Sequence, residues 1–314
     1  MQDGTLHYWN PAAMDAPLRS VTGHQDTMLT LDVDTATGRI YSGDASGRVV
    51  MWTPTNDART AFTAVTAKGE VPTKRAAAVV VCAGELLAAS WDNTLRIGDA
   101  ATAELKRTVP LPGQPKGIAV SAAAPGVRVV ATGSALVVVA GDAAPGAPVA
   151  ADWSPTCISM SADGTLVAVG GKDKKVHTYR VEGTSLTPDG ETKEAAGEIS
   201  AVAISPDGKY IAAGDAVKEV RLYSTGAGKE TLMSGKWVFH TTRVTGLKWS
   251  PDSRHVATVG TDRRLCVWSP TSDSPVLVQD LANPQPFADV AWADNSSVWT
   301  LGTDGVASFR TLTL

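Results

Sequence analysis

The chain has few of the residues that hold small secreted or membrane proteins together. Its 314 residues include only three cysteines, Cys82, Cys157 and Cys266, which are odd in number, far apart and each in an apolar run. This pattern predicts reduced, buried thiols, and no Cys/His spacing suggests zinc. The most apolar stretch, 127–140, is too short to span a bilayer and contains Arg128. We therefore expect a cytoplasmic protein without membrane contact.

The chain also lacks an excess of either charge and lacks nucleotide-binding motifs. With 28 basic and 32 acidic residues, its net charge is −4 and its pI about 5.7, which gives no reason to expect nucleic acid or an anionic membrane as a partner. No GxxxxGK[ST] loop and no GxGxxG after a strand is present, and the first ten residues do not form a signal peptide. We expect no cofactor.

What the chain does contain is an internal repeat. The segment 236–269 reads as one unit of short alternating strands, 244–249, 255–260 and 265–268, separated by polar turns. The end of its third strand recurs about every 43 residues, a period typical of β-propeller blades. These recurring positions are Trp9, Trp52, Gly98, Ala140, Tyr179, Tyr223, Trp268 and Arg310.

The repeat predicts an all-β fold, a seven-bladed β-propeller of WD-type repeats with four antiparallel strands per blade. Ser-x-Asp turns at 161–164, 205–208 and 250–253 fall between first and second strands. We expect one domain over 1–314, in which residues 1–10 are a remnant of a preceding repeat. The irregular stretch 110–155 is interpreted as a divergent blade, with a linker between two domains as the alternative.

Two further expectations concern the ring itself. Only four residues follow Arg310, so the last blade lacks an outer strand, and we expect 17–22 to supply it and close the ring. The second strands, such as LVAVGG, are rich in small residues, which we interpret as crowding around a central channel. An enzyme would need converging polar groups in this channel, and these apolar strands do not suggest them.

The histidines and turn aspartates of the repeats favour a structural role. In such blades a His bonds the turn Asp and, through a strand hydroxyl, the Trp, which forms a buried network that must be fully satisfied. No Ser or Cys nucleophile is placed beside them, so we predict no catalytic and no metal-binding residue. The residues with predicted structural roles are His24, His240, Asp92, Asp173, Asp262, Trp52 and Trp268, with Asp304 at the same turn position as Asp92.

One face of the predicted propeller is rich in basic residues, while the Asp163, Asp207 and Asp252 turns lie on the other. Either these charges are a solvated surface, or they form a docking face for an acidic partner, where charge would speed association and set orientation. Few aromatic residues are available there to stack RNA bases. The basic residues are Lys74, Arg75, Lys116, Lys172, Lys174, Lys175, Lys218, Lys236, Arg243, Arg263 and Arg264.

Three aromatic residues, Trp91, Trp237 and Phe239, are expected at or near this rim. Trp and Arg are typical anchors of interfaces, but Trp237 and Phe239 are equally compatible with packing of an outer strand. The predicted partner-binding residues are Lys172, Lys174, Lys175, Lys236, Trp237, Arg243, Arg263, Arg264 and Trp91.

In the order and detail of its repeats, the chain resembles the carboxy-terminal propeller of the actin-interacting protein 1 family. The resemblance rests on 235–269, on SPDGKYIAAGDAVKEVRLYS, on LVAVGGKDKKVHTYRVEG and on DGTLHYWNPAA before the GH unit. It covers essentially the whole chain, and the displaced turn Asp in GDAVKEV is shared. Gly98 and Arg310, where an aromatic residue is usual, and Ser46, at a turn Asp position, depart from the pattern.

The resemblance implies an actin-regulatory interaction module of the actin cytoskeleton, with actin filaments and cofilin as partners in filament disassembly. The family carries two propellers in tandem, and its better-supported actin contacts lie largely on the first, so none of those residues can be assigned here. The alternative is a WD-repeat scaffold subunit of an unrelated complex.

Overall fold

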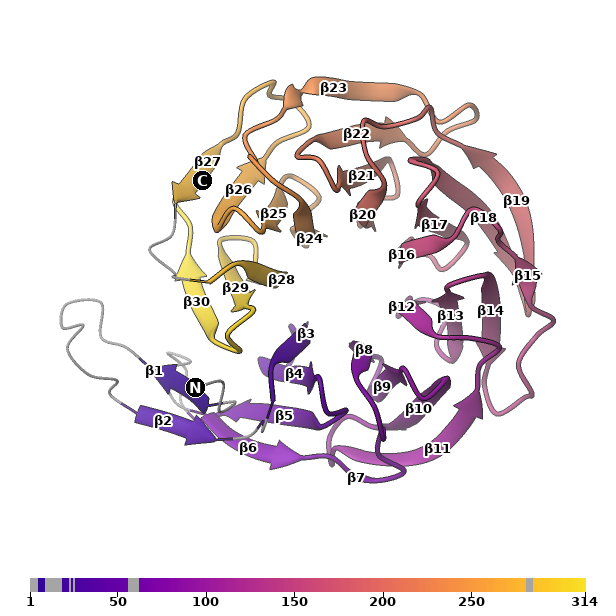
Figure 1. Ribbon diagram of the computed structural model, residues 1–314, viewed down its shortest axis with the longest axis vertical. Helices are drawn as coiled ribbons and strands as arrows, with labels where there is room; N and C mark the ends of the chain where they lie inside the picture. Colours follow the sequence, from indigo (N-terminus) through magenta and orange to yellow (C-terminus); the bar gives the residue numbers. More distant parts are fainter. Residues whose placement is uncertain (1–4, 9–18, 23, 25, 56–61, 281–284) are drawn as a thin grey trace.

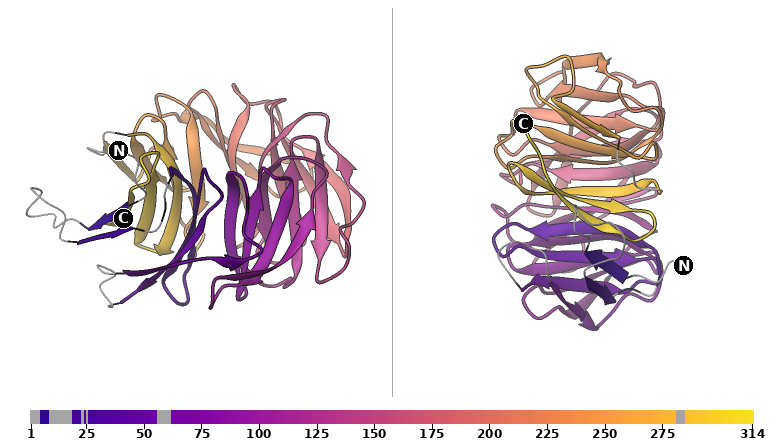
Figure 2. Two further views of the ribbon diagram at one scale, coloured as in Figure 1. Left: turned by 60° about the horizontal axis from the view of Figure 1, so that its bottom comes forward. Right: turned by 90° about the vertical axis from the view of Figure 1, so that its left-hand side faces the viewer.

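The chain forms a ring of seven β-sheets around a central channel, the β-propeller that the repeat predicts (Figure 1). The computed structural model describes residues 5–8, 19–22, 24, 26–55, 62–280 and 285–314. Every described element is a β-strand, and the first strand of each blade is innermost (Figure 1). The side views show the strands running through the thickness of the ring (Figure 2). Seven of the eight predicted third-strand ends, Trp52 to Arg310, lie within the third strand of a blade, and Trp9 lies outside the described residues.

The first four blades each have four consecutive antiparallel strands, and in blade 2 a short fifth strand, β7 (Lys68–Gly69), pairs in parallel with the outermost of them. Blade 1 consists of β3 (Met28–Asp34), β4 (Arg39–Asp44), β5 (Val49–Pro54) and β6 (Phe62–Thr66). Blade 2 consists of β8 (Ala76–Cys82), β9 (Glu85–Ser90), β10 (Thr94–Asp99) and β11 (Glu104–Pro110). Blade 3 consists of β12 (Pro115–Val120), β13 (Val127–Thr132), β14 (Ala135–Ala140) and β15 (Val149–Ala150). Blade 4 consists of β16 (Pro155–Met160), β17 (Leu166–Gly171), β18 (Val176–Glu182) and β19 (Ser185–Glu191).

Blades 5 and 6 repeat this arrangement, and blade 7 has three strands. Blade 5 consists of β20 (Ile199–Ile204), β21 (Tyr210–Asp215), β22 (Val220–Ser224) and β23 (Thr231–Trp237). Blade 6 consists of β24 (Val244–Trp249), β25 (Val256–Gly260), β26 (Arg264–Trp268) and β27 (Leu277–Asp280). Blade 7 consists of β28 (Phe287–Asp294), β29 (Ser297–Gly302) and β30 (Ala307–Thr311).

The expected closure of the ring by 17–22 is wrong for the part of that segment that the structure describes. Within it, β2 (Arg19–Thr22) pairs with β1 (Thr5–Tyr8) as a separate two-stranded sheet, and residues 17 and 18 lie outside the described residues. Pairing with a strand so near in sequence requires closing only a short loop, which favours it entropically. The prediction that residues 1–10 are a remnant of a preceding repeat concerns a segment that lies outside the described residues except for β1.

The seam between blade 7 and blade 1 is instead closed by side-chain packing. One apolar cluster contains Met28, Leu31 and Trp52 of blade 1 together with Trp299 and Leu301 of blade 7. Comparable clusters fill the space between the other neighbouring blades. Burial of apolar surface between neighbouring sheets therefore holds the ring together.

Hydroxyl groups of the innermost strands also join neighbouring blades. In each of three consecutive blades, the hydroxyl of the second residue of the first strand donates to the carbonyl of the first residue of the next blade. These bonds are Thr156 Oγ1 to Ile199 O, Ser200 Oγ to Val244 O and Thr245 Oγ1 to Phe287 O, at 2.5, 2.6 and 2.8 Å. Backbone carbonyls at the strand starts are thus satisfied by the neighbouring blade.

The repeated Ser-x-Asp turns have the same geometry in blades 4, 5 and 6. In each, the serine hydroxyl donates to the aspartate two positions later and accepts the N–H that opens the second strand. For Ser205 and Asp207 the oxygen–oxygen distance is 2.6 Å. These aspartates therefore cap their own turns, as Asx turns do.

Candidate functional site: the upper face and the central channel

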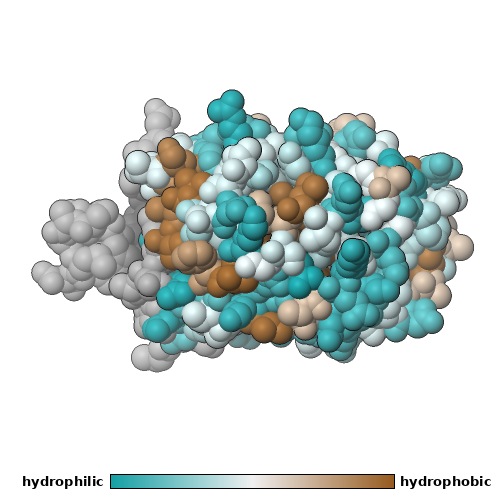
Figure 3. Space-filling model, turned by 90° about the horizontal axis from the view of Figure 1, so that it is seen from above, coloured by the Kyte–Doolittle hydropathy of each residue, from teal (hydrophilic) through white to brown (hydrophobic). Residues whose placement is uncertain are grey.

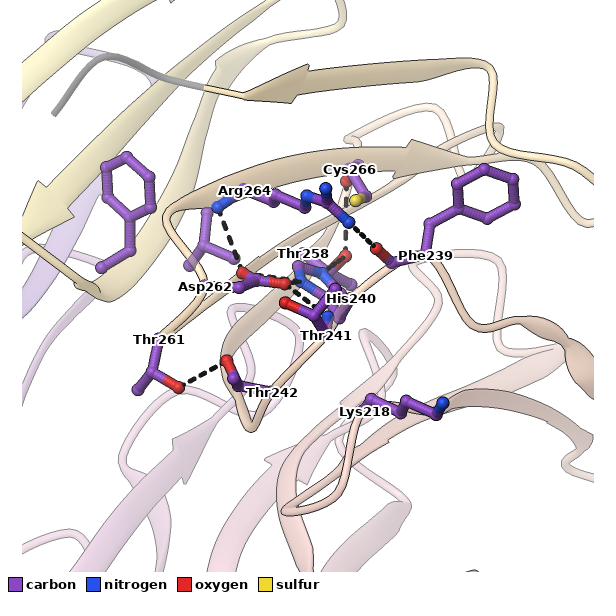
Figure 4. A network of polar contacts seen from close by, with 12 residues as sticks. Lys218, Phe239, His240, Thr241, Thr242, Thr258, Thr261, Asp262, Arg264 and Cys266 are labelled. Carbon is purple, nitrogen blue, oxygen red and sulfur yellow. Dashed lines mark hydrogen bonds and ion pairs between the residues drawn. The ribbon is translucent and has the colours of Figure 1, made fainter.

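A buried network of hydrogen bonds links His240 to Trp268 in blade 6, and Figure 4 shows His240, Asp262 and Thr258 within it. Nδ1 of His240 donates to Asp262 Oδ2 over 3.0 Å, and its Nε2 lies 2.9 Å from the Thr258 hydroxyl. That hydroxyl also accepts from Nε1 of Trp268 over 2.8 Å. Burial alone would raise the pKa of Asp262, but the hydrogen bond from His240 holds it below the usual range. The polar side chains of this network, those of His240, Asp262, Thr258 and Trp268, therefore bond to one another and stabilise blade 6.

Blade 1 contains the same kind of hydrogen-bond network, and one of its members, Asp44, is not predicted from the sequence. Nε2 of His24 and Nε1 of Trp52 both lie 2.7 Å from the Ser42 hydroxyl. The acidic partner of His24 is Asp44, at 2.9 Å, located at the end of the second strand rather than in the turn. Because Asp44 also accepts the N–H of Ser46 and Arg48, it organises the turn that lacks an aspartate at position 46.

Asp173 and Asp304 also act within their own turns. Asp173 Oδ2 lies 2.8 Å from Nε2 of His177, whose ring stacks on Trp153 at a centroid distance of 3.9 Å. Asp304 accepts the N–H of Val306. No group of three or more potential metal-ligating side chains occurs in the part of the chain that the structure describes, and the carboxylates do not form an acid–base pair.

The upper face is defined here by the connections from one blade to the next and by the turns between second and third strands. The predicted basic residues on it fall into two groups. Lys175, Lys236 and Arg243 form ion pairs with Glu191, Asp273 and Glu198, and Arg264 donates to the carbonyl of Phe239. The others form no ion pair with a described residue: Lys74, Arg75, Lys116, Lys172, Lys174, Lys218 and Arg263.

The three rim aromatics differ in accessibility. Trp237 is 0% exposed, stacks on Trp268 and donates its indole N–H to Ser272, so its assignment as a partner-binding residue is wrong and the packing alternative holds. Phe239 is 44% exposed, with its ring edge-on to Trp268. Trp91 is partly exposed beside two cations. A buried indole on an outer strand cannot be told from a surface one by sequence position alone.

The outer wall of the ring carries small apolar patches among polar residues (Figure 3). Apolar side chains on the outer strands include Leu232 of β23, Val276 before β27 and Val278 within β27. Their exposed fractions are 44%, 40% and 37%. Such scattered residues are normal on a soluble protein surface. The wall is therefore a weaker candidate for a specific site than the upper face.

The central channel is lined by the first strands, not by the second strands as expected. Its volume is about 230 Å³, and its wall contains Asp32, Lys248 and Asp289. Burial raises the pKa of Asp289 to about 6 despite the opposing charge of Lys248, and it likewise raises the pKa of Asp32. Consecutive residues of the first strands, such as Leu29 to Asp32, line the channel.

The carboxylates of the channel, and hydroxyls of its first strands, are nevertheless engaged by the backbone. Asp32 accepts the N–H of Val81, Asp289 accepts that of Leu31, and the hydroxyls donate to carbonyls as described above. Burial raises the pKa of Cys157 to about 11, so this thiol is a poor nucleophile. No histidine is among the described residues lining the channel. The arrangement offers no activated nucleophile.

Comparisons with known proteins agree with the repeat pattern. The family model "WD domain, G-beta repeat" matches residues 150–180, 187–224 and 234–269. The solved Cps50 (Swd1) β-propeller domain of Myceliophteria thermophila superposes with a TM-score of 0.77 over 92% of this chain and 98% of that one. At 13% identity, this likeness concerns the fold alone.

Similar curated proteins align along almost the whole chain. The "66 kDa stress protein" of Physarum polycephalum is 30% identical over 299 residues, 95% of this chain and 48% of that protein. "Actin-interacting protein 1" of Caenorhabditis elegans is 28% identical over 91% of this chain and 47% of its own length, and that of Drosophila melanogaster 27% over 96% and 48%. The chain spans about half the length of the curated relatives it matches. No helix long and apolar enough to cross a membrane occurs among the described residues.

Proposed function

Starting from a chain that carries WD40 repeats and has actin-interacting protein 1 among its homologues, we propose that it is an actin-regulatory protein–protein interaction module. It acts on filaments together with cofilin, in filament disassembly. The observation that carries the proposal is the alignment of proteins named actin-interacting protein 1 along more than nine tenths of this chain. A chain that is half as long as these relatives would perform part of their role.

The proposed mode of action is surface contact without catalysis. Seven of the predicted basic residues on the upper face form no ion pair with a described residue, and such cations attract an acidic partner over several ångströms and orient it. The engaged polar groups of the channel support a non-enzymatic role. We place the protein in the cytoplasm, on the actin cytoskeleton, without a cofactor and without nucleic acid or membrane as partners.

Co-sedimentation with actin filaments tests the proposal. The chain should pellet with filaments in the presence of cofilin, and less of it should pellet at higher salt, because contacts between exposed charges are screened. Pelleting that is independent of cofilin or of salt would contradict the proposed mode of action. If neither pelleting nor a cofilin-dependent increase in filament severing is seen, the alternative of a scaffold subunit in an unrelated complex gains support.

A further inference from the structure

We infer that Trp91, with Arg75 and Lys116 beside its ring, is the anchor point for an acidic segment of a protein partner. The inference rests on the proposed function in one respect, that a partner approaches the upper face. It adds where on this face the contact is made and what chemistry the partner brings. Trp91 lies in the turn between β9 and β10, Arg75 precedes β8 and Lys116 lies at the start of β12.

Two cations converge on this one indole. The guanidinium carbon of Arg75 lies 4.7 Å from the centroid of the Trp91 ring, and Nζ of Lys116 lies 5.9 Å from it. Both distances are within the range of a cation–π contact. Lys116 comes from blade 3 and Arg75 from the connection into blade 2, so the cluster bridges two blades at the edge of the channel, which Lys116 also lines.

This cluster has no acidic partner among the described residues, as is also true of Lys172, Lys174, Lys218 and Arg263, but only here do two such cations converge on an indole among the described residues. Lys175, Lys236 and Arg243 each have a carboxylate in contact. Arg75 and Lys116 have none among the described residues, nor has the neighbouring Lys74. Like charges held close together repel each other, and a bound carboxylate would remove that repulsion. The local charge therefore favours an anionic ligand.

The carboxylate of Asp92, the residue after Trp91, is already engaged by other groups. It accepts hydrogen bonds from the backbone N–H and the hydroxyl of Thr73 and pairs with Arg96 at 3.1 Å. Burial would raise the pKa of Asp92, but the hydrogen bonds from Thr94 and Thr73 lower it. Asp92 thus stays ionised for this turn and forms no ion pair with Arg75 or Lys116.

The backbone that carries the cluster is held rigidly. The carbonyl of Lys74 accepts from the Ser90 hydroxyl, and the N–H of Trp91 donates to the carbonyl of Arg75. With the two bonds from Thr73 to Asp92, the connection before β8 is fixed to the turn between β9 and β10. A site whose backbone is ordered before binding loses less conformational entropy when a partner docks.

The geometry favours an acidic peptide over nucleic acid. Two cations beside a partly buried indole leave little ring surface for a base to stack on, and stacking supplies much of the affinity for single strands. A carboxylate, by contrast, can accept two parallel hydrogen bonds from a guanidinium. Aspartate or glutamate side chains in an extended segment can contact Arg75 and Lys116 while the segment covers Trp91.

The test measures binding of a fluorescein-labelled oligoglutamate peptide to the full chain by fluorescence anisotropy at low ionic strength. Replacing Arg75→Gln together with Lys116→Gln should weaken binding about fivefold, since each exposed charge contact makes a modest contribution. The matched control is Lys172→Gln with Lys174→Gln, which removes the same charge from the same face and should have a smaller effect. Peptide binding should also shift the indole N–H resonance of Trp91, assigned with Trp91→Phe.

Three results would overturn the inference: equal weakening in the two double variants, no peptide binding by the unchanged chain, or tighter binding of an oligouridylate than of the peptide. The peptide assay contains no actin, so its outcome is independent of filament co-sedimentation. If filaments pellet the chain and the Arg75/Lys116 variant equally well, the anchor is wrong while the proposed function stands. If the peptide binds as expected but filaments do not, the proposed function fails and the anchor stands.

Discussion

The Asp289 carboxylate lies 3.4 Å from the amide nitrogen of Leu31, a residue 258 positions earlier in the chain. This contact crosses the seam where blade 7 meets blade 1. The Asp289 carboxyl, whose pKa is raised, therefore lies at the junction of the first and last blades, which are not consecutive in the chain. The stability of the ring should therefore depend on whether this carboxyl is protonated.

Replacing Asp289→Asn should stabilise the protein at pH 7.5. Burial raises the pKa of Asp289 in the folded protein to about 6. Between pH values of about 4 and 6 the folded protein therefore holds a proton that the unfolded chain has released, and the free energy of unfolding falls as pH rises through this range. The gain from Asn is at most about 3 kcal/mol and should shrink as pH falls below 6. Urea unfolding at several pH values measures it; a gain that is constant with pH would contradict the assignment.

Asp207→Asn is the matched comparison, with the opposite sign expected. Hydrogen bonds from Ser205 and from the Lys209 amide lower the pKa of Asp207 although burial acts the other way. Its stabilising contribution is present above the unfolded-state pKa and is lost as pH falls through the lowered folded-state pKa. The variant should thus be less stable than the unchanged chain at pH 7.5, by about 0.5–1 kcal/mol.

Replacing Thr258→Val should destabilise blade 6 by about 2–3 kcal/mol, because the buried His240 Nε2 and Trp268 Nε1 lose their common partner. Thr242→Val is the control, since Thr242 contacts the Thr261 hydroxyl at the surface and should cost under about 0.5 kcal/mol. Thermal unfolding compares the two. Equal losses would mean that the buried hydroxyl has no special role.

Replacing Gly47→Ala should destabilise the turn between β4 and β5. Gly47 has φ +94°, and a Cβ there would lie 2.4 Å from the carbonyl oxygen of Lys74. Gly84, with φ +81° and nothing within 4 Å of its Cβ position, separates the two causes. Gly84→Ala should cost about 1 kcal/mol from backbone strain alone, and Gly47→Ala clearly more. Similar melting temperatures for the two variants would show that the clash is relieved at little cost.

Reversing free cations of the upper face should weaken filament binding if the proposed function holds. Lys174→Glu with Arg263→Glu changes two residues without an ion pair and should reduce cofilin-dependent pelleting severalfold. Lys209→Glu with Arg254→Glu makes the same charge change at the Ser-x-Asp turns of the opposite face and should leave pelleting nearly unchanged. A loss common to both would indicate a general charge effect instead of a face-specific contact.

The fold could be read from the sequence because its information is local and repeated. Each third strand ends in phase with the next, and the Ser-x-Asp turns follow from side chains bonding their own backbone. The fate of Arg19–Thr22 could not be read in this way. Both β1 and β30 are third strands of a repeat, so the pattern alone does not say which of them this segment pairs with.

The candidate site was less accessible to sequence reasoning. That Lys236 is paired with Asp273 and Lys116 is not depends on contacts between different blades, which no spacing encodes. Asp44 could not be predicted because the repeat pattern places the aspartate in the turn, where this chain has Ser46. The Asp44 carboxylate, two residues earlier, forms the hydrogen bond with His24 instead. The charged wall of the channel does not follow from the small residues of the second strands, because the first strands line the channel.

One further strand has a consequence for how this protein behaves at high concentration. β7 (Lys68–Gly69), in the chain leaving blade 1, pairs in parallel with β11 along the outer edge of blade 2. The outer strand of blade 3 has only two residues, and that of blade 4 contains Pro188 and a register shift. Covered, short or interrupted edges are poor templates for pairing with another copy. Around blades 2 to 4, the ring should therefore resist edge-to-edge aggregation.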